Sequence, residues 1–116
     1  MNINDIIYAT TCRDRQGFCH VTYCDGTTDI IANGIGELYE RLCHLSNRGR
    51  YFMIGRSSFM CENNIVKINP SRGKLVMGFD TLSAKHQELD FSDYLLRELR
   101  NNIIYPKIRN YHPIHD

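Results

Sequence analysis

The sequence predicts a mainly β fold: a small multi-sheet arrangement, similar to a β-sandwich, with one short amphipathic helix and a C-terminal helix. Three observations predict it. Short runs of β-branched and aromatic residues recur along the chain. Glycine- and proline-containing turn signals separate these runs. Only two segments place apolar residues at helical spacing.

The length of the chain fits a single compact domain. It has 116 residues, of which 42% are apolar, enough to bury a core. We expect residues 1–103 to form this domain and residues 104–116, which contain two prolines and no clear period, to form a C-terminal tail.

The first half of the chain predicts three strands and then a helix. The strands are expected at residues 5–11, 18–24 and 27–32, with a polar loop at residues 12–17. Asp25-Gly26 predicts a two-residue hairpin turn, because both positions tolerate a positive φ. An amphipathic helix is expected at residues 35–46, where apolar residues recur at helical spacing: Ile35, Leu38, Leu42 and Leu45.

The second half returns to strand character. One strand is expected at residues 51–61 with an interruption at residues 55–57, and a hairpin is expected from residues 65–68 and 74–79 around a turn at 70–73. Ser92 is placed to cap a final helix with its hydroxyl. One face of that helix is expected to carry Phe91, Leu95, Leu99 and Ile103.

Several function classes find no support in the sequence. The chain has no nucleophile-elbow motif and no phosphate loop. Cys19 and Cys24 have the wrong spacing for a zinc site, and strand alternation places them on opposite faces. Buried or half-buried strand cysteines are therefore expected instead of metal ligands. We therefore expect no enzyme, no cofactor, no metal and no small-molecule substrate. A cysteine-dependent enzyme remains a remote alternative that would need a thiol beside a histidine in a cleft.

The cellular compartment is predicted from cysteines and hydropathy. Five cysteines at irregular spacing do not form a disulfide framework, which favours reduced thiols and a cytoplasmic protein. No stretch approaches the roughly 20 apolar residues of a membrane span, and the N-terminus lacks a secretory leader. We expect no membrane partner.

Side chains suited to DNA gather in three predicted loops. Arginine and glutamine can read base edges, and hydroxyl and amino groups can bind phosphates. The candidate DNA-binding residues are Arg13, Arg15, Gln16, Arg56, Ser57 and Lys85. The alternative is that they are ordinary solvated loop residues. The net charge of +1 is low for a DNA-binding domain, so the charges would have to segregate onto one face.

The order of these segments resembles the LytTR family of bacterial DNA-binding domains. Residues 5–8 (DIIY) resemble its opening strand, residues 18–26 its second strand and "dG" hairpin, and residues 38–42 (LYERL) its Leu-x-Glu-x-Leu helix. Residues 50–65 (RYFMIGRSSFMCENNI) resemble its most specific signature, "rF-x-r-i-H-R-S-y-i-V-N-x-x-x-I". Residues 73–76 and 89–93 resemble its closing motifs, and the match covers residues 5–103.

The resemblance implies a compact arrangement of small sheets whose loops enter successive major grooves of DNA. Arg56 takes the position of the signature arginine, with a structural ion pair as its alternative role. Three residues depart from the pattern. Gly55 replaces a histidine, Cys61 an asparagine, and Asp93 stands where the family often has an arginine. A carboxylate there would repel phosphate, although it could accept from a cytosine amino group.

The resemblance implies a bacterial transcriptional regulator that reads the major groove. Arg56 with Arg15 or Gln16 would contact bases, and Arg13, Lys85 and Ser57 would anchor phosphates. Because one small domain covers little DNA, a dimer on repeated half-sites is expected. The alternative is a protein-interaction or dimerisation module that kept the fold and lost DNA binding, in which the apolar tail residues associate.

Overall fold

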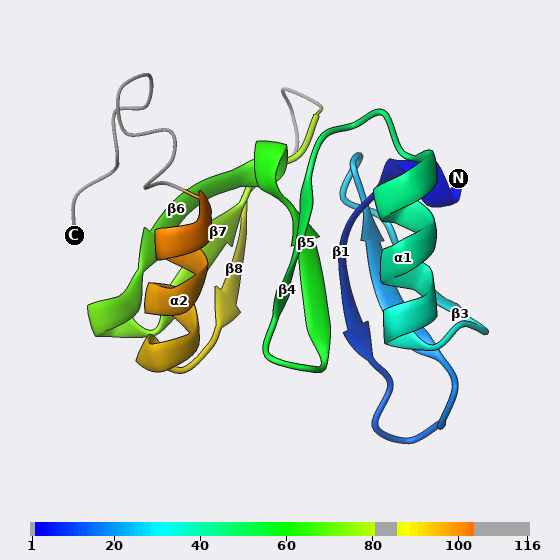
Figure 1. The fold of residues 1–116 in the computed structure, drawn as a ribbon, viewed down its shortest axis with the longest axis horizontal. Coiled ribbons are helices and arrows are strands. Elements are labelled where there is room, and N and C mark those ends of the chain that lie inside the picture. Colours follow the sequence, from blue (N-terminus) through cyan, green and yellow to red (C-terminus); the bar gives the residue numbers. More distant parts are fainter. Residues whose placement is uncertain (1, 81–85, 104–116) are drawn as a thin grey trace.

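The computed structural model describes residues 2–80 and 86–103 of the chain. Within these residues the protein forms a five-stranded and a three-stranded antiparallel sheet (Figure 1), which confirms the mainly β, multi-sheet prediction. The elements are η1 (Ile3–Asp5), β1 (Ile6–Thr11), β2 (Cys19–Tyr23), β3 (Thr28–Ile31), α1 (Ile35–Leu45), β4 (Tyr51–Ile54), β5 (Ser58–Cys61), η2 (Glu62–Asn64), β6 (Ile65–Asn69), η3 (Pro70–Arg72), β7 (Lys74–Met77), β8 (Gln87–Asp90) and α2 (Asp93–Ile103).

Strand β1 lies at the centre of the larger sheet. The strand order is β3-β2-β1-β5-β4, with β1 hydrogen-bonded to β2 on one side and to β5 on the other. Ala9 in β1 lies opposite Val21 in β2 and Phe59 in β5, and all three side chains are buried. The smaller sheet has the order β6-β7-β8. The two β1 pairings place the ends of neighbouring strands, and the loops that follow them, side by side.

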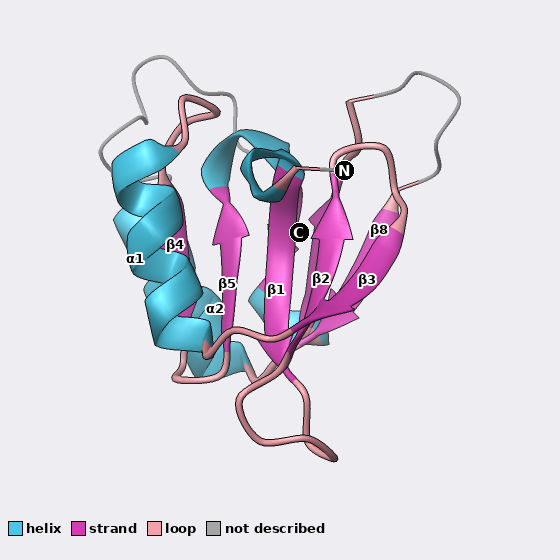
Figure 2. Cartoon of the chain, turned by 90° about the vertical axis from the view of Figure 1, so that its right-hand side faces the viewer, coloured by secondary structure: helices cyan, strands magenta, loops and turns pink. Residues whose placement is uncertain are grey.

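Helix α1 covers one side of the larger sheet near β4 and β5 (Figure 2). Its Leu38 and Leu42 are fully buried, as the helical spacing predicts. The rings of Tyr39 and Tyr51 each lie 5.7 Å from the ring of Phe59, centroid to centroid, so one aromatic cluster joins helix and sheet. The predicted helix at residues 35–46 is confirmed, and it ends at Leu45.

Helix α2 packs against η3, β4 and β6 and so joins the two sheets. The Ser92 hydroxyl accepts a hydrogen bond from the Leu95 backbone N–H at 3.3 Å, which confirms the predicted cap. Leu99 is buried as expected, but Leu96, absent from the expected apolar face, is more deeply buried than Leu95. The helix contacts strands on two sides, so its buried face is wider than a single stripe.

The turn at Asp25-Gly26 differs from the predicted two-residue hairpin. The Tyr23 N–H donates to the Thr27 carbonyl at 2.8 Å, which leaves residues 24–26 as a three-residue loop. Within this loop, Gly26 alone has a positive φ, of 91°. A loop of this length needs one left-handed residue rather than two, and glycine provides it.

The predicted interruption at residues 55–57 is confirmed, but the chain also reverses direction there, which was not predicted. Strands β4 and β5 form a hairpin in which Ile54 lies opposite Ser58. Gly55 has a φ of 64°, a left-handed conformation that lets the chain turn within three residues. Arg56 is therefore at the tip of a hairpin and not in a break within one strand.

Strand β3 is an edge of the larger sheet in the described part of the chain. Tyr23 and Thr27 form a hydrogen-bonded pair, so by alternation Ile30 lies in a non-hydrogen-bonded pair with His20 and its N–H points away from β2. The Asp29 carboxylate accepts that N–H at 2.8 Å. The edge is thus partly satisfied by its own side chain.

The five cysteines are free thiols. Cys12, Cys19 and Cys61 are buried, and Cys24 is half-buried. Burial raises the pKa of the Cys19 and Cys61 thiols above the usual value, and the Cys19 thiol donates to the Asn33 carbonyl at 3.0 Å. Because the thiolate is the reactive form, raised pKa values make these two thiols packing residues rather than nucleophiles.

Candidate nucleic-acid interface

The two arginine-bearing loops lie side by side at one edge of the molecule. Strand β1 ends where β5 begins, with Thr10 opposite Ser58. The Thr11 N–H donates to the Ser57 carbonyl at 2.9 Å, which joins the start of the loop at residues 12–18 to the turn at residues 55–57. Both loops lie at the lower end of Figure 1. We call this surface, made of residues 12–18 and 55–57, the arginine edge.

The loop at residues 12–18 is held closed by its own backbone. The Cys12 N–H donates to the Phe18 carbonyl at 3.0 Å, and the Phe18 N–H donates to the Arg15 carbonyl at 3.2 Å. The Arg15 guanidinium lies 4.2 Å from the centroid of the Phe18 ring. This stacking restrains the guanidinium while Arg13, Arg15 and Gln16 remain exposed.

The turn at residues 55–57 presents Arg56 to solvent. Gly55, Arg56 and Ser57 are all exposed. Arg56 forms no ion pair with any residue that the structure describes, so the alternative of a structural ion pair has no support there. A free guanidinium on a short hairpin keeps all five of its donors for a partner.

The start of α2 comes close to the same turn. A Cβ at Gly55 would lie 3.5 Å from a methyl carbon of Leu95, in ordinary contact, so the turn packs against the first helical residues. Asp93 begins this helix, where a carboxylate favours the helix dipole, and its Oδ2 lies 3.8 Å from Nε of Arg97. Asp14 lies within the arginine edge, and Asp93 lies two positions before Leu95 in the sequence.

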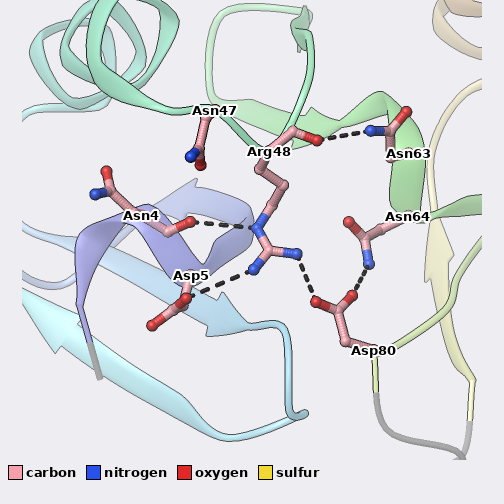
Figure 3. Close-up of a pocket in the computed structure, with 7 residues that line it drawn as sticks. All are labelled: Asn4, Asp5, Asn47, Arg48, Asn63, Asn64 and Asp80. Carbon is pink, nitrogen blue, oxygen red and sulfur yellow. Dashed lines mark hydrogen bonds and ion pairs between the residues drawn. The ribbon is translucent and has the colours of Figure 1, made fainter.

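The opposite edge holds a different kind of arginine (Figure 3). Arg48 donates from Nε to the Asn4 carbonyl at 3.2 Å and from one terminal nitrogen to Asp80 at 2.7 Å, and it lies 3.5 Å from Asp5. The Asn64 amide also donates to Asp80 at 3.0 Å. We call these residues the Arg48 cluster. It borders a polar hollow of about 420 Å³ that is also lined by Asn47 and Asn63.

The Arg48 cluster was not identified from the sequence, because no candidate site residue was predicted among these side chains. Its members come from four segments separated by 15 or more positions, and no local pattern marks such a group. The hydrogen bond from Arg48 holds the pKa of Asp80 below its usual value. The remaining predicted residue, Lys85, lies outside the described residues. The Asp80 N–H donates to the Cys24 carbonyl at 2.7 Å.

No helix within the described ranges is long and apolar enough to cross a membrane. Among those ranges, no group of three or more histidine, cysteine or acidic side chains is arranged to hold a metal ion.

Comparison with known proteins yields a similarity of structure. No family model matches the sequence, and no curated protein sequence matches it significantly. The fold of this chain is similar to a solved structure from Bacillus cereus. That structure is the LytTr DNA-binding domain of a protein described as a methyl-accepting/DNA response regulator. The two share 15% sequence identity with a TM-score of 0.52, over 96% of this chain and 86% of that one. The chain therefore has the LytTR-type fold that the order of its sequence motifs predicts.

Proposed function

We propose that this protein is a bacterial transcriptional regulator that binds double-stranded DNA and reads the major groove with the arginine edge. The observation that carries the proposal is the hydrogen bond from Thr11 to Ser57, which joins two loops 46 positions apart into one surface. The similarity to a LytTr DNA-binding domain supports it at the level of the fold.

The side chains of this edge suit both kinds of DNA contact. Arg56, at the tip of a hairpin, and Arg15, restrained by Phe18, would donate to guanine O6 and N7, and Gln16 could pair with adenine. Arg13 and Ser57 would donate to phosphates, as would Lys85 from outside the described residues. Short hairpins on a rigid sheet can enter a groove about 12 Å wide without rearrangement.

The distribution of ion pairs explains how a chain of net charge +1 can present a basic surface. Arg48, Lys74 and Arg97 all lie beside carboxylates elsewhere in the fold. Within the described residues, Arg13, Arg15 and Arg56 form no such pairs. Arg13, Arg15 and Arg56 thus keep their positive charge at the arginine edge, where it would attract phosphates.

A single domain of this size would cover one half-site. We propose that two copies bind repeated half-sites in the bacterial cytoplasm, with centres about one helical turn (~34–36 Å) apart or a multiple of it. Moving the half-sites apart by about five base pairs places them on opposite faces of the duplex and should weaken paired binding. Single-site affinity should not change.

The test is a titration of the protein against DNA from upstream of its own coding region at several salt concentrations. The log–log slope should be near −0.9 per phosphate contacted, and Arg56→Ala should weaken specific binding by about 1–3 kcal/mol. Arg41→Ala, an exposed arginine on α1, is the matched control and should bind normally. A wild-type protein that does not bind at low salt would exclude this function.

The second candidate is a protein-interaction or dimerisation module. It is favoured by Asp93 at the start of α2 and by two apolar side chains left open to solvent, Tyr94 at 71% exposed and Leu45 at 63%. Sedimentation of the protein alone distinguishes the two candidates. Concentration-dependent self-association that Tyr94→Ser or Leu45→Ser removes, together with no DNA binding, would support this module.

A further inference from the structure

A third rigid turn, at residues 70–73, was predicted only as a connection between strands, but the structure gives it the properties of a contact element. It comprises η3 (Pro70–Arg72) and Gly73, and it joins β6 to β7. Pro70 is fully buried, so the turn is anchored at its first residue. Ser71 and Arg72, which follow it, are exposed.

Hydrogen bonds on both sides fix the conformation of this turn. The Asn69 carboxamide oxygen accepts from the Arg72 N–H at 3.2 Å and from the Ser71 hydroxyl at 2.9 Å. Gly73 closes the turn with a φ of 67°, and its N–H donates to the Pro70 carbonyl at 3.1 Å. A turn that is ordered before binding presents its side chains at little further entropic cost.

Close packing ties the same turn to the start of α2. The Phe91 N–H donates to the Gly73 carbonyl at 3.0 Å, and a Cβ at residue 73 would lie only 3.0 Å from the Phe91 carbonyl oxygen. Helix α2 in turn contacts Gly55 through Leu95. The turn at residues 70–73 is thus connected through α2 to the arginine edge.

The charge of Arg72 is left free, unlike that of the lysine two positions later. Lys74 lies within ion-pair distance of both Asp90 and Glu88. Arg72 is exposed and forms no ion pair or side-chain hydrogen bond with any residue in the described part of the chain. A positive charge on an ordered turn with no protein partner is available to a polyanion.

The placement of the turn matches the dimensions of DNA. In Figure 1 the loop at 12–18, the turn at 55–57 and the turn at 70–73 follow one another from right to left along the horizontal long axis, in the lower part of the view. The long axis measures 37 Å. One turn of B-DNA is about 34–36 Å, so a duplex lying along this surface would meet the three turns within one helical repeat.

We propose that the turn at residues 70–73 is a phosphate anchor, in which the Arg72 guanidinium holds the DNA backbone at the far end of the contact surface from Arg15. This inference rests on the proposed DNA-binding function and extends it. It assigns Arg72 a role that is independent of base sequence: it fixes the position and length of the footprint while the arginine edge reads bases.

The experiment compares wild type, Arg72→Ala, Arg72→Lys and the control Arg41→Ala in salt titrations against both specific and unrelated DNA. Loss of one phosphate contact should reduce the salt slope by about 0.9 per bound chain and lower affinity roughly fivefold to tenfold near 0.1 M salt, equally on both DNAs. Arg72→Lys should restore the slope, and hydroxyl-radical footprinting should show protection lost at one end only. Circular dichroism and thermal unfolding should be unchanged, since Arg72 is exposed.

The outcomes separate this inference from the function on which it rests. If the wild type binds and Arg72→Ala keeps its slope and affinity, the anchor is wrong and the DNA-binding function stands. If Arg72→Ala loses affinity only for specific DNA with its slope unchanged, Arg72 reads a base and the phosphate assignment is wrong. If the wild type binds no DNA, both proposals are excluded.

Discussion

The two edges of this domain use the same side chain in opposite ways. At one edge Arg48 is 17% exposed and its guanidinium faces two carboxylates and a carbonyl. At the other, Arg56 stands on a three-residue turn with no ion pair in the described residues. An arginine in a loop has a structural role where carboxylates and carbonyls of the protein surround it, as at Arg48. It is available for binding where it has no such partners, as at Arg56.

Removal of Arg48 should produce the largest effect and confine it to stability. Arg48→Ala leaves Asp5 and Asp80 facing each other without a cation, and we expect a loss of about 2 kcal/mol in the free energy of unfolding. Urea unfolding measures it. DNA affinity of the folded fraction should match wild type; a drop in that affinity would mean that the two edges are not separate.

Tyr51 lies at the same edge as Arg48. Its buried hydroxyl donates to the Ile6 carbonyl at 2.6 Å. Tyr51→Phe leaves that carbonyl unpaired and should cost about 1–2 kcal/mol at neutral pH. Burial raises the pKa of Tyr51 from 10.0 to about 12. Because the pKa of Tyr51 is higher in the folded state than in the unfolded state, the contribution of its hydroxyl to the free energy of unfolding is complete below pH 10. This contribution is lost as the pH rises toward 12.

The pH dependence of stability above pH 9 therefore gives a second measurement of the contribution of Tyr51. Denaturant midpoints recorded between pH 9 and 12 should fall less steeply for Tyr51→Phe than for the wild type. Parallel curves would show that ionisation of Tyr51 is not linked to folding.

Acid should weaken the Arg48 cluster by a smaller amount. The folded pKa of Asp80 lies below 3.8, so its contribution is present above that value and is lost as the pH falls through the folded pKa. Asp80 is 45% exposed, which limits the effect to less than about 1 kcal/mol. Stability measured from pH 5 to 2 should decline less for Asp80→Asn than for wild type, and an equal decline would contradict the linkage.

The smallest predicted effect belongs to the arginine edge. Asp14→Asn removes the carboxylate between Arg13 and Arg15 and should strengthen DNA binding by about 0.5 kcal/mol, roughly twofold, at low salt. Fluorescence anisotropy can resolve this change, and added salt should remove it. Glu40→Gln, on the exposed side of α1, is the control. Weaker binding by Asp14→Asn would indicate that the carboxylate accepts a hydrogen bond from a base.

Sequence patterns predicted the elements of this fold better than its connections. The β-branched and aromatic residues at positions 5–11 and the spacing of Leu38 and Leu42 report local preferences, and both elements form as expected. The loop length at Gly26 and the reversal of the chain at Gly55 were not predicted, because a glycine indicates a left-handed position without indicating the loop length or the direction of the next strand. Those depend on partner strands elsewhere in the chain.

The same distinction holds for the candidate sites. Arg15 and Arg56 were identified individually, and only the pairing of β1 with β5 brings their loops together. Arg48 was overlooked because its partners, Asp5 and Asp80, are 43 and 32 positions away. A residue whose role is defined by distant partners leaves no periodic or local signal.

The carboxylate of Asp29 has a consequence for how copies of this protein meet. It occupies the N–H of Ile30 that would otherwise face a neighbouring molecule, so the outermost strand offers one fewer donor for ribbon-to-ribbon pairing. Sheets of two copies are thereby discouraged from fusing into a continuous array as the concentration rises.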